Sequence, residues 1–370
     1  MKVCGIIVEY NPLHNGHIHH IEKARELTNC DVLIAVMSGN YVQRGELAII
    51  DKWQRAKKAI ENKVDLVIEL PYNYILQSAS QFAFGAISIL KLLKVDSIVF
   101  GSECNNIENL MEIANVNINV NHLKENLKQG HSFVKSYSLL QGSYYPNDIL
   151  GIAYLKALQS SNIIPYTIKR TTNYHDETIS GNIASATSIR KAIFNNQDFI
   201  NTTPMEFSYT NNNQDIFFLL KQLMNTLSLE YLKTIFLVSE GIETHILKCL
   251  NSTNNYDEFI DKAINRRYTK ARIQRVCMHI INQVTKDEIN NLPKLNYIRP
   301  LAFNTIGQKY LKVLKDDETL IIASDFSKIP KEYRQIEIKA TYTYTYFISN
   351  LTIKNEVLTR ELQGPIIIKD

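Results

Sequence analysis

A stretch near the start of the chain decides the fold: Gly5-Ile6-Ile7-Val8-Glu9-Tyr10-Asn11-Pro12-Leu13-His14-Asn15-Gly16-His17. The apolar, β-branched run over residues 3–8 predicts a strand, which ends in a turn rich in Asn, Pro and Gly. Apolar residues at helical spacing in Ile18–Leu27 predict a helix after that turn. Gly16 has no Cβ, so backbone can approach a ligand closely there. The helix would direct its free N–H groups and the positive end of its dipole at an anion.

Two histidines flank the turn as His14-x-Gly16-His17. Imidazoles at this spacing and place suit the phosphates of a nucleotide, and the pattern resembles the HxGH signature of nucleotidylyltransferases and class I aminoacyl-tRNA synthetases. Two alternatives stay open. The four histidines between residues 14 and 20 could bind a metal, but such sites usually add Cys or carboxylate ligands and the only acid nearby is Glu9. The turn could also be purely structural, with solvated histidines. We favour phosphate binding and assign no metal site.

Composition is that of a globular protein with more than one core. The 370 residues exceed what a single core usually supports, and 45% hydrophobic with 21% charged residues is ordinary. The net charge of +4 means that any nucleic-acid surface must be local. Five scattered cysteines without a C-x-x-C pair indicate a reducing cytoplasm. We expect a cytoplasmic protein without a signal peptide or membrane span.

The first half of the chain alternates short apolar runs with helical patterns. Strand-like runs occupy residues 3–8, 32–37, 66–70, 97–100 and 165–168. This alternation predicts an α/β fold with a Rossmann-like, doubly wound parallel sheet, in which ligands bind beyond the carboxyl ends of the strands. Residues 41–50 form a long connection without periodicity, for which a functional loop and a plain surface loop are equally good interpretations. A basic cluster at Lys124, Lys128 and Lys135 favours a solvated face over a binding site.

The composition changes after about Asn201, and the polar segment 211–214 marks a boundary. We expect residues 1–205 to form a nucleotidylyltransferase-like catalytic domain that binds ATP, and residues 206–370 a mainly helical domain. Helices are predicted at 217–227, 229–238, 240–250 and 256–286. The alternation Tyr342-Thr343-Tyr344-Thr345-Tyr346 and the run Leu320–Ala323 fit either a strand or a buried helix.

A second motif, Ser185-Ala186-Thr187-Ser188-Ile189-Arg190, opens a predicted helix. Taken alone, its hydroxyls indicate helix capping. Together with the histidine motif, it resembles the S-[ST]-T-x-[IV]-R element of nucleotidylyltransferases, from which Ala186 departs by lacking a hydroxyl. Ser185, Thr187 and Arg190 are then expected to hold the leaving pyrophosphate of ATP. The catalytic candidates are His14, His17 and Arg190.

Three segments extend the resemblance: residues 5–12, Ser38-Gly39-Asn40-Tyr41-Val42-Gln43-Arg44-Gly45-Glu46, and residues 266–275 with Arg266-Arg267-Tyr268-Thr269 and Arg272-Ile273-Gln274-Arg275. They look like the bacterial tRNA(Met) cytidine acetate ligase family over nearly the whole chain. Members of that family use ATP and acetate to form N4-acetylcytidine at the wobble base of elongator tRNA(Met).

The resemblance implies that ATP is bound by the following residues: Ile7, Val8, Glu9, Tyr10, Asn11, Pro12, Leu13, His14, Asn15, Gly16, His17, Ile18, His19, His20, Gly101, Asn147 and Arg170. Mg²⁺ commonly bridges such phosphates, but no acidic pair marks a site for it.

A basic segment in the second half predicts an RNA surface. No acidic residue occurs between Lys262 and Lys286. Apolar residues recur there at helical spacing, so one face packs and the other carries the charge. The candidates for binding tRNA are Arg266, Arg267, Tyr268, Lys270, Arg272 and Arg275, with Tyr268 expected to stack on an unpaired base. A solvated basic face without a partner is the alternative.

Two other functions compete with the ligase. A small-molecule nucleotidylyltransferase would use the first 200 residues and leave the second half without a role. A non-catalytic RNA-binding protein on the same scaffold would use neither motif for chemistry.

Overall fold

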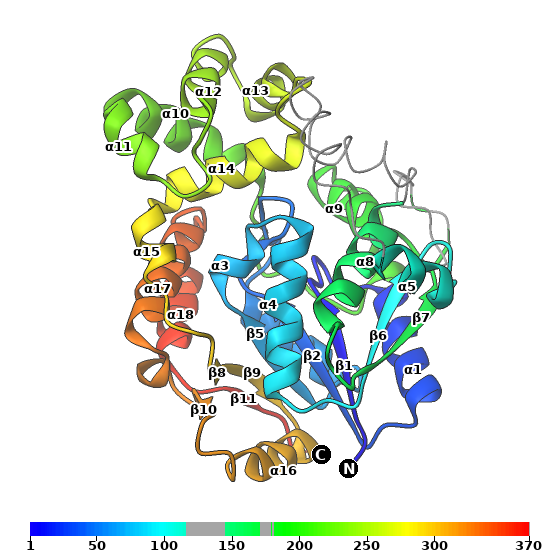
Figure 1. The fold of residues 1–370 in the computed structure, drawn as a ribbon. Coiled ribbons are helices and arrows are strands. Elements are labelled where there is room, and N and C mark those ends of the chain that lie inside the picture. Colours follow the sequence, from blue (N-terminus) through cyan, green and yellow to red (C-terminus); the bar gives the residue numbers. More distant parts are fainter. Residues whose placement is uncertain (116–144, 171–178, 180, 370) are drawn as a thin grey trace.

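The structure is a computed structural model that describes residues 1–115, 145–170, 179 and 181–369 (Figure 1). The basic cluster Lys124, Lys128 and Lys135 lies outside these residues. Within the described ranges, none of the helices combines the length and the apolar character needed to cross a membrane.

A seven-stranded sheet forms the centre of the molecule, in the order β11-β9-β5-β2-β1-β6-β7. All neighbouring strands run parallel except β5 and β9, which are antiparallel. The strands are β1 (Val3–Val8), β2 (Val32–Ser38), β5 (Leu66–Leu70), β6 (Ser97–Ser102), β7 (Ile164–Lys169), β9 (Pro300–Phe303) and β11 (Ile366–Ile367). The α/β, Rossmann-like prediction is confirmed.

Helices cover both faces of the sheet because its central strands are apolar on both sides. Along β1, Cys4, Ile6 and Val8 pack against α1 (Asn15–Thr28) and α2 (Lys52–Glu61). Val3 and Ile7 point to the opposite face, where α4 (Ala79–Leu92) and α8 (Pro146–Leu158) pack.

The chain changes direction next to β1. From β1 it proceeds to β2 and β5 on one side, then crosses over to β6 and β7 on the other (Figure 1). Such a switch point opens a crevice beyond the carboxyl ends of the two strands that flank it. The turn that carries His14 and His17 follows β1, and Gly101 lies near the end of β6. Both therefore belong to the same edge of the sheet.

The remaining elements of the described chain are short or helical. In the first part they are β3 (Tyr41–Val42), β4 (Glu46–Leu47), α3 (Tyr72–Ile75), α5 (Ile107–Asn115) and α9 (Ala186–Phe194). After residue 205 they are α10 (Ile216–Thr226), α11 (Leu229–Thr234), α12 (Ile242–Leu250), α13 (Tyr256–Ala263), α14 (Lys270–Asn282), α15 (Lys286–Asn290), β8 (Tyr297–Ile298), α16 (Thr305–Leu314), β10 (Ile321–Ile322), α17 (Lys331–Tyr346) and α18 (Leu351–Leu362).

Several expectations for the second half need correction. The single helix expected over 256–286 is divided into α13 and α14, because Thr269 caps a new helix with its side chain. Of the two segments for which strand and helix were both open, Tyr342–Tyr346 is helical, as the end of α17, and the run 320–323 contains the short strand β10. The boundary near residue 205 does not separate two independent units, since β9 and β11 belong to the first sheet. The helices from α10 to α15 are thus inserted between strands β7 and β9 of the same sheet.

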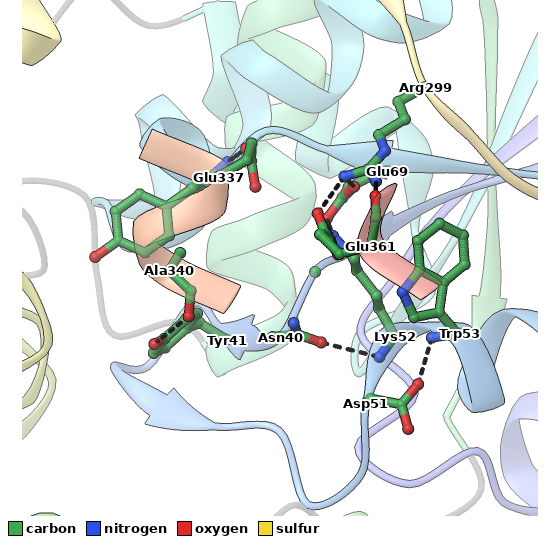
Figure 2. A network of polar contacts seen from close by, with 12 residues as sticks. Asn40, Tyr41, Asp51, Lys52, Trp53, Glu69, Arg299, Glu337, Ala340 and Glu361 are labelled. Atoms are coloured by element: carbon green, nitrogen blue, oxygen red, sulfur yellow. Dashed lines mark hydrogen bonds and ion pairs between the residues drawn. The ribbon is translucent and has the colours of Figure 1, made fainter. Parts of the chain in front are cut away.

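A buried ionic cluster fastens this returning segment (Figure 2). Lys52 Nζ lies 2.6 Å from a carboxylate oxygen of Glu69 on β5 and 2.9 Å from one of Glu361 on α18. Arg299 Nη1, just before β9, lies 2.9 Å from Glu69 and 2.6 Å from Glu361. Buried charges of this kind are tolerated only when each is paired. The cluster therefore specifies how β9 and α18 dock against α2 and β5.

Candidate active site

His14 and His17 close the start of α1 through a reciprocal cap. The Nδ1 atom of His14 accepts a hydrogen bond from the backbone N–H of Gly16 at 3.1 Å. In return, Nδ1 of His17 accepts from the backbone N–H of His14 at 3.3 Å. The two rings stack with their centroids 3.7 Å apart. A Cβ on Gly16 would lie 2.9 Å from the His14 ring, so the close packing requires glycine.

This arrangement fixes the protonation of both rings. Burial, with the charges of Arg170 and Arg190, lowers the pKa of His14 to about 3. Burial also lowers the pKa of His17 well below its usual value. Both imidazoles are therefore neutral at physiological pH, and since Nδ1 accepts in each, the proton resides on Nε2. The turn therefore carries two neutral Nε2–H groups, each of which can donate a hydrogen bond to a phosphate oxygen.

The neighbouring residues of the turn are structural supports. Nε2 of His20 lies 3.1 Å from the carbonyl oxygen of Val99 on β6, so this histidine holds α1 against the sheet. The Asn15 amide donates to the carbonyls of Asn182 and Asn201, at 2.7 and 2.8 Å. These bonds bring the segments on either side of α9 to the histidine turn.

Helix α9 places the second motif beside the first. Ser185 caps the helix by accepting from the backbone N–H of Ser188 at 3.0 Å, so the capping interpretation is correct for this hydroxyl. Thr187 lies in the first turn. Nη1 of Arg190 donates to the carbonyl of Asn11 at 2.7 Å, which places the guanidinium at the end of β1. Through this hydrogen bond the second motif contacts the turn that carries the first.

The carboxyl end of β6 forms the other wall. A Cβ on Gly101 would lie 3.4 Å from the Arg170 side chain, so the two are in contact. Nη1 of Arg170 donates to Oδ1 of Asn147 at 3.2 Å. The Asn147 amide in turn donates to Glu103 at 2.6 Å. The three residues that the resemblance places at the nucleotide, 101, 147 and 170, are therefore brought together.

The connection 41–50 is a buried hairpin of β3 and β4, so the surface-loop interpretation is wrong. The backbone N–H of Gln43 donates to the Glu9 carboxylate at 2.7 Å. Burial, opposed by that hydrogen bond, raises the pKa of Glu9. Ile49 N–H donates to the Asn11 side chain at 2.7 Å. The hairpin is thus bonded to the β1 turn on the β2 side of the switch point.

Candidate metal ligands do not gather at this site. Among the described residues, no group of three or more His, Cys, Asp or Glu side chains is arranged to hold a metal ion. A Mg²⁺ ion that accompanied a nucleotide would be held mainly by the phosphates.

The basic segment is only partly presented to solvent. Arg266, Arg267 and Lys270 are exposed, and Arg272 is partly exposed. Burial lowers the pKa of Arg275 to about 10, and its guanidinium donates to the carbonyl of Gln43 at 3.4 Å. Arg275 therefore packs against the hairpin.

Tyr268 is also directed inward, so the expected stacking of its ring on a base is incorrect. The side chain is 4% exposed, and its hydroxyl donates to the carbonyl of Glu240 at 2.8 Å. The guanidinium groups of Arg267 and Arg272 lie over its ring, 5.6 and 5.2 Å from the centroid. Glu240 also pairs with both arginines, so an acid distant in sequence neutralises part of the segment.

Comparison with known proteins agrees with this geometry. The family model described as HIGH Nucleotidyl Transferase matches residues 1–358. The tRNA(Met) cytidine acetate ligase of Anoxybacillus flavithermus is 37% identical over 99% of both chains, and that of Oceanobacillus iheyensis is 38% identical over the whole of both. The chain belongs to the tRNA(Met) cytidine acetate ligase family.

A solved structure of this family has the same fold. Thermotoga maritima TmcAL, crystallised with alpha-thio ATP, superposes with a TM-score of 0.88 and 30% sequence identity over the whole of both chains. Its apo form superposes with a TM-score of 0.90 at the same identity and coverage. The resemblance to this family, first seen in the sequence motifs, therefore extends to the three-dimensional structure of the chain.

Some residues of the site carried no signal in the sequence. Glu103 and Asp148 hold the Asn147 turn against β6. Single acids of this kind fit any exposed turn, and only the fold shows their partners. The carbonyl of Asn11 could not be assigned at all, because any residue would supply it.

Proposed function

We propose that the protein is an ATP-dependent ligase that activates acetate and transfers the acetyl group to a tRNA cytidine. An acetate oxygen attacks the α-phosphorus of ATP, the bond to the β-phosphate breaks, and pyrophosphate leaves. The product is acetyl-adenylate. The observation that carries this proposal is the pair of neutral Nε2–H donors at the switch point, within the charge field of Arg170 and Arg190.

This step needs alignment and charge stabilisation, with no covalent intermediate on the protein. His14 and His17 would donate to phosphate oxygens whose charge changes in the transition state. Arg190, Ser185 and Thr187 would hold the departing pyrophosphate at α9. Arg170 and Asn147 would contact the nucleotide from the β6 side, where Gly101 leaves room. If Mg²⁺ accompanies ATP, it supplies further charge neutralisation on the phosphates.

In the second step, N4 of the wobble cytidine of elongator tRNA(Met) attacks the acetyl carbonyl. A carbon–nitrogen bond forms, AMP leaves, and N4 gives up one proton, which yields N4-acetylcytidine. The base must leave its stack to reach the adenylate. Such a substrate implies a cytoplasmic enzyme. The exposed cations Arg266, Arg267 and Lys270 before and at the start of α14, with Arg272, are the proposed contacts to the RNA backbone.

Exchange of labelled pyrophosphate into ATP tests the first step. Purified protein is assayed with acetate, with a panel of other carboxylic acids, and with phosphorylated cofactor precursors. Acetate-dependent exchange, followed by N4-acetylcytidine in tRNA(Met) by mass spectrometry, is the expected result. Exchange only with a phosphorylated precursor would identify a small-molecule nucleotidylyltransferase. Absence of exchange with every compound would leave a non-catalytic RNA-binding protein.

Charge reversal tests the RNA surface. In the variant with Arg267→Glu and Lys270→Glu, the dissociation constant for tRNA should rise, and the salt dependence should flatten by roughly one unit per lost phosphate contact. The matched control reverses the charges of Lys57 and Lys63. Lys63 precedes β5, so it lies at the end of the sheet opposite the carboxyl ends of its parallel strands. Equal tRNA affinity of parent and Arg267/Lys270 variant at every salt concentration would refute this surface.

A further inference from the structure

The β3–β4 hairpin connects the nucleotide site to α14. Gly45 at its tip has φ +87° and lies against the α14 backbone, where a Cβ would be only 2.4 Å from the backbone nitrogen of Arg275. On the next residue, the Glu46 carboxylate accepts a hydrogen bond from Nε2 of Gln274 at 3.3 Å. The tip is therefore seated on the helix without intervening side chains, and its position is set by α14.

The same carboxylate also faces the nucleotide site. Oε2 of Glu46 lies 3.7 Å from Nη2 of Arg190, whose Nη1 is held by the carbonyl of Asn11. Both side chains are mostly shielded, at 17% and 21% exposure. Arg190 thus has two anchors, one on the β1 turn and one on the hairpin. Two anchors on different elements fix the plane of a guanidinium, and that plane decides which phosphate oxygens it can reach.

We propose that Glu46 is a positioning residue for the reaction: it orients Arg190 toward the pyrophosphate of ATP, and Gln274 on α14 holds Glu46 in place. This inference rests on the proposed adenylation of acetate. The sequence left the role of the hairpin open. In this proposal, α14 in the second half of the chain supports Arg190 in the first half through the hairpin. In this role the carboxylate acts through Arg190.

The proposal predicts a particular split between rate and affinity. Glu46→Gln removes a negative charge close to the phosphates, so electrostatics alone cannot weaken ATP binding. The loss of the ionic anchor leaves Arg190 misaligned in the transition state, which lowers the rate. We expect the maximal rate of acetate-dependent ATP–pyrophosphate exchange to fall about tenfold, with a KM for ATP no higher than that of the parent.

Two further variants separate positioning from structure. Gln274→Ala should lower the maximal rate about threefold, with the same unchanged or lower KM, because Glu46 keeps its ion pair but loses its support. In an Arg190→Ala background, Glu46→Gln should have less than about a twofold further effect, since the residue through which it acts is gone. The control is Glu240→Gln, which removes an acid that pairs with arginines of the same segment but lies outside this chain of contacts.

Several outcomes would overturn the proposal. They are an unchanged rate in Glu46→Gln, a raised KM at unchanged rate, an equal loss in the Arg190→Ala background, or an equal loss in Glu240→Gln. Thermal midpoints within about 2 °C of the parent verify that the variants are folded. A parent protein without acetate-dependent exchange would refute the proposed function, and the role of Glu46 with it. If the parent shows exchange and the losses caused by Glu46→Gln and Arg190→Ala simply add, only the role of Glu46 is refuted.

Discussion

Replacing His14 by asparagine should separate its two tasks, capping α1 and donating to phosphate. The Nδ1 atom that caps the helix is bonded to Cγ, as is Oδ1 of an asparagine, so the shorter side chain can accept the same hydrogen bond from Gly16 N–H. Asparagine is among the best N-cap residues, whereas alanine would cost about 1 kcal/mol. His14→Asn lacks the Nε2–H donor. Removing one preorganised donor to a transition state typically costs roughly 100- to 1,000-fold in rate.

The measurements are acetate-dependent ATP–pyrophosphate exchange and urea unfolding. We expect His14→Asn to lose about 100- to 1,000-fold in exchange and to unfold within about 0.5 kcal/mol of the parent at pH 8. Thr285→Asn is the matched control, because Thr285 caps α15 in a similar way, away from the nucleotide site. It should keep full activity.

The pH dependence of stability provides an independent check. The folded pKa of His14, about 3, lies below the unfolded value of 6.5, so the unfolded chain takes up the proton first as pH falls. The parent therefore loses stability below pH 6.5, by about 2 kcal/mol at pH 5 from this residue. His14→Asn cannot take up that proton and should be correspondingly less sensitive to acid. Exchange activity within fivefold of the parent would refute the assignment of His14 as a phosphate donor.

Three further predictions concern stability. Burial and the charge of Glu69 raise the pKa of Glu337 to about 8, so the unfolded chain releases this proton first and stability falls as pH rises from 4.5 to 8. Glu337→Gln keeps the acceptor for the backbone N–H of Tyr72. The free energy of unfolding of this variant, measured in urea relative to the parent, should rise by roughly 3 kcal/mol between pH 5 and pH 8. A difference that stays constant with pH would contradict this. Lys52→Met leaves two buried carboxylates with Arg299 alone and should cost about 3–5 kcal/mol in the same assay, so a loss below 1 kcal/mol would show that the cluster is hydrated. Gly45→Ala should cost about 1–3 kcal/mol because of its positive φ and the missing space; a variant as stable as the parent would mean that the hairpin can move away from α14.

The first sheet strands were predictable because they are parallel and covered on both faces. Residues 32–37 and 66–70 are therefore continuous apolar runs with clear turns at their ends. The histidine turn was equally predictable, since the pattern that marks it consists of residues close together in sequence. Strand β11, by contrast, has two residues, and within the described part of the chain β9 is its one partner. No local pattern marks such a strand, because its partner decides where it forms.

The open and the incorrect expectations for the second half have a common physical cause. Tyr342–Tyr346 alternates with a period of two, so a strand and a helix both remained open; in the helix that forms, Tyr344 packs inside while Tyr342 and Tyr346 are exposed. Tyr268 lies in a basic run, yet it is covered by residues from a different part of the chain. Sequence patterns give the polarity of a residue, and tertiary contacts decide which side of it faces water.

The return of β9 and β11 to the first sheet affects how the chain matures during synthesis. A ribosome releases β1, β2, β5 and β6 long before residue 300, so β5 must wait with one edge unpaired while the helices from α10 to α15 emerge. During that interval Glu69 has Lys52 but lacks Arg299, and Glu361 is not yet made. The nascent protein therefore holds a nearly complete nucleotide crevice beside an open sheet edge. Chaperone capture and strand exchange between nascent chains should concentrate at β5.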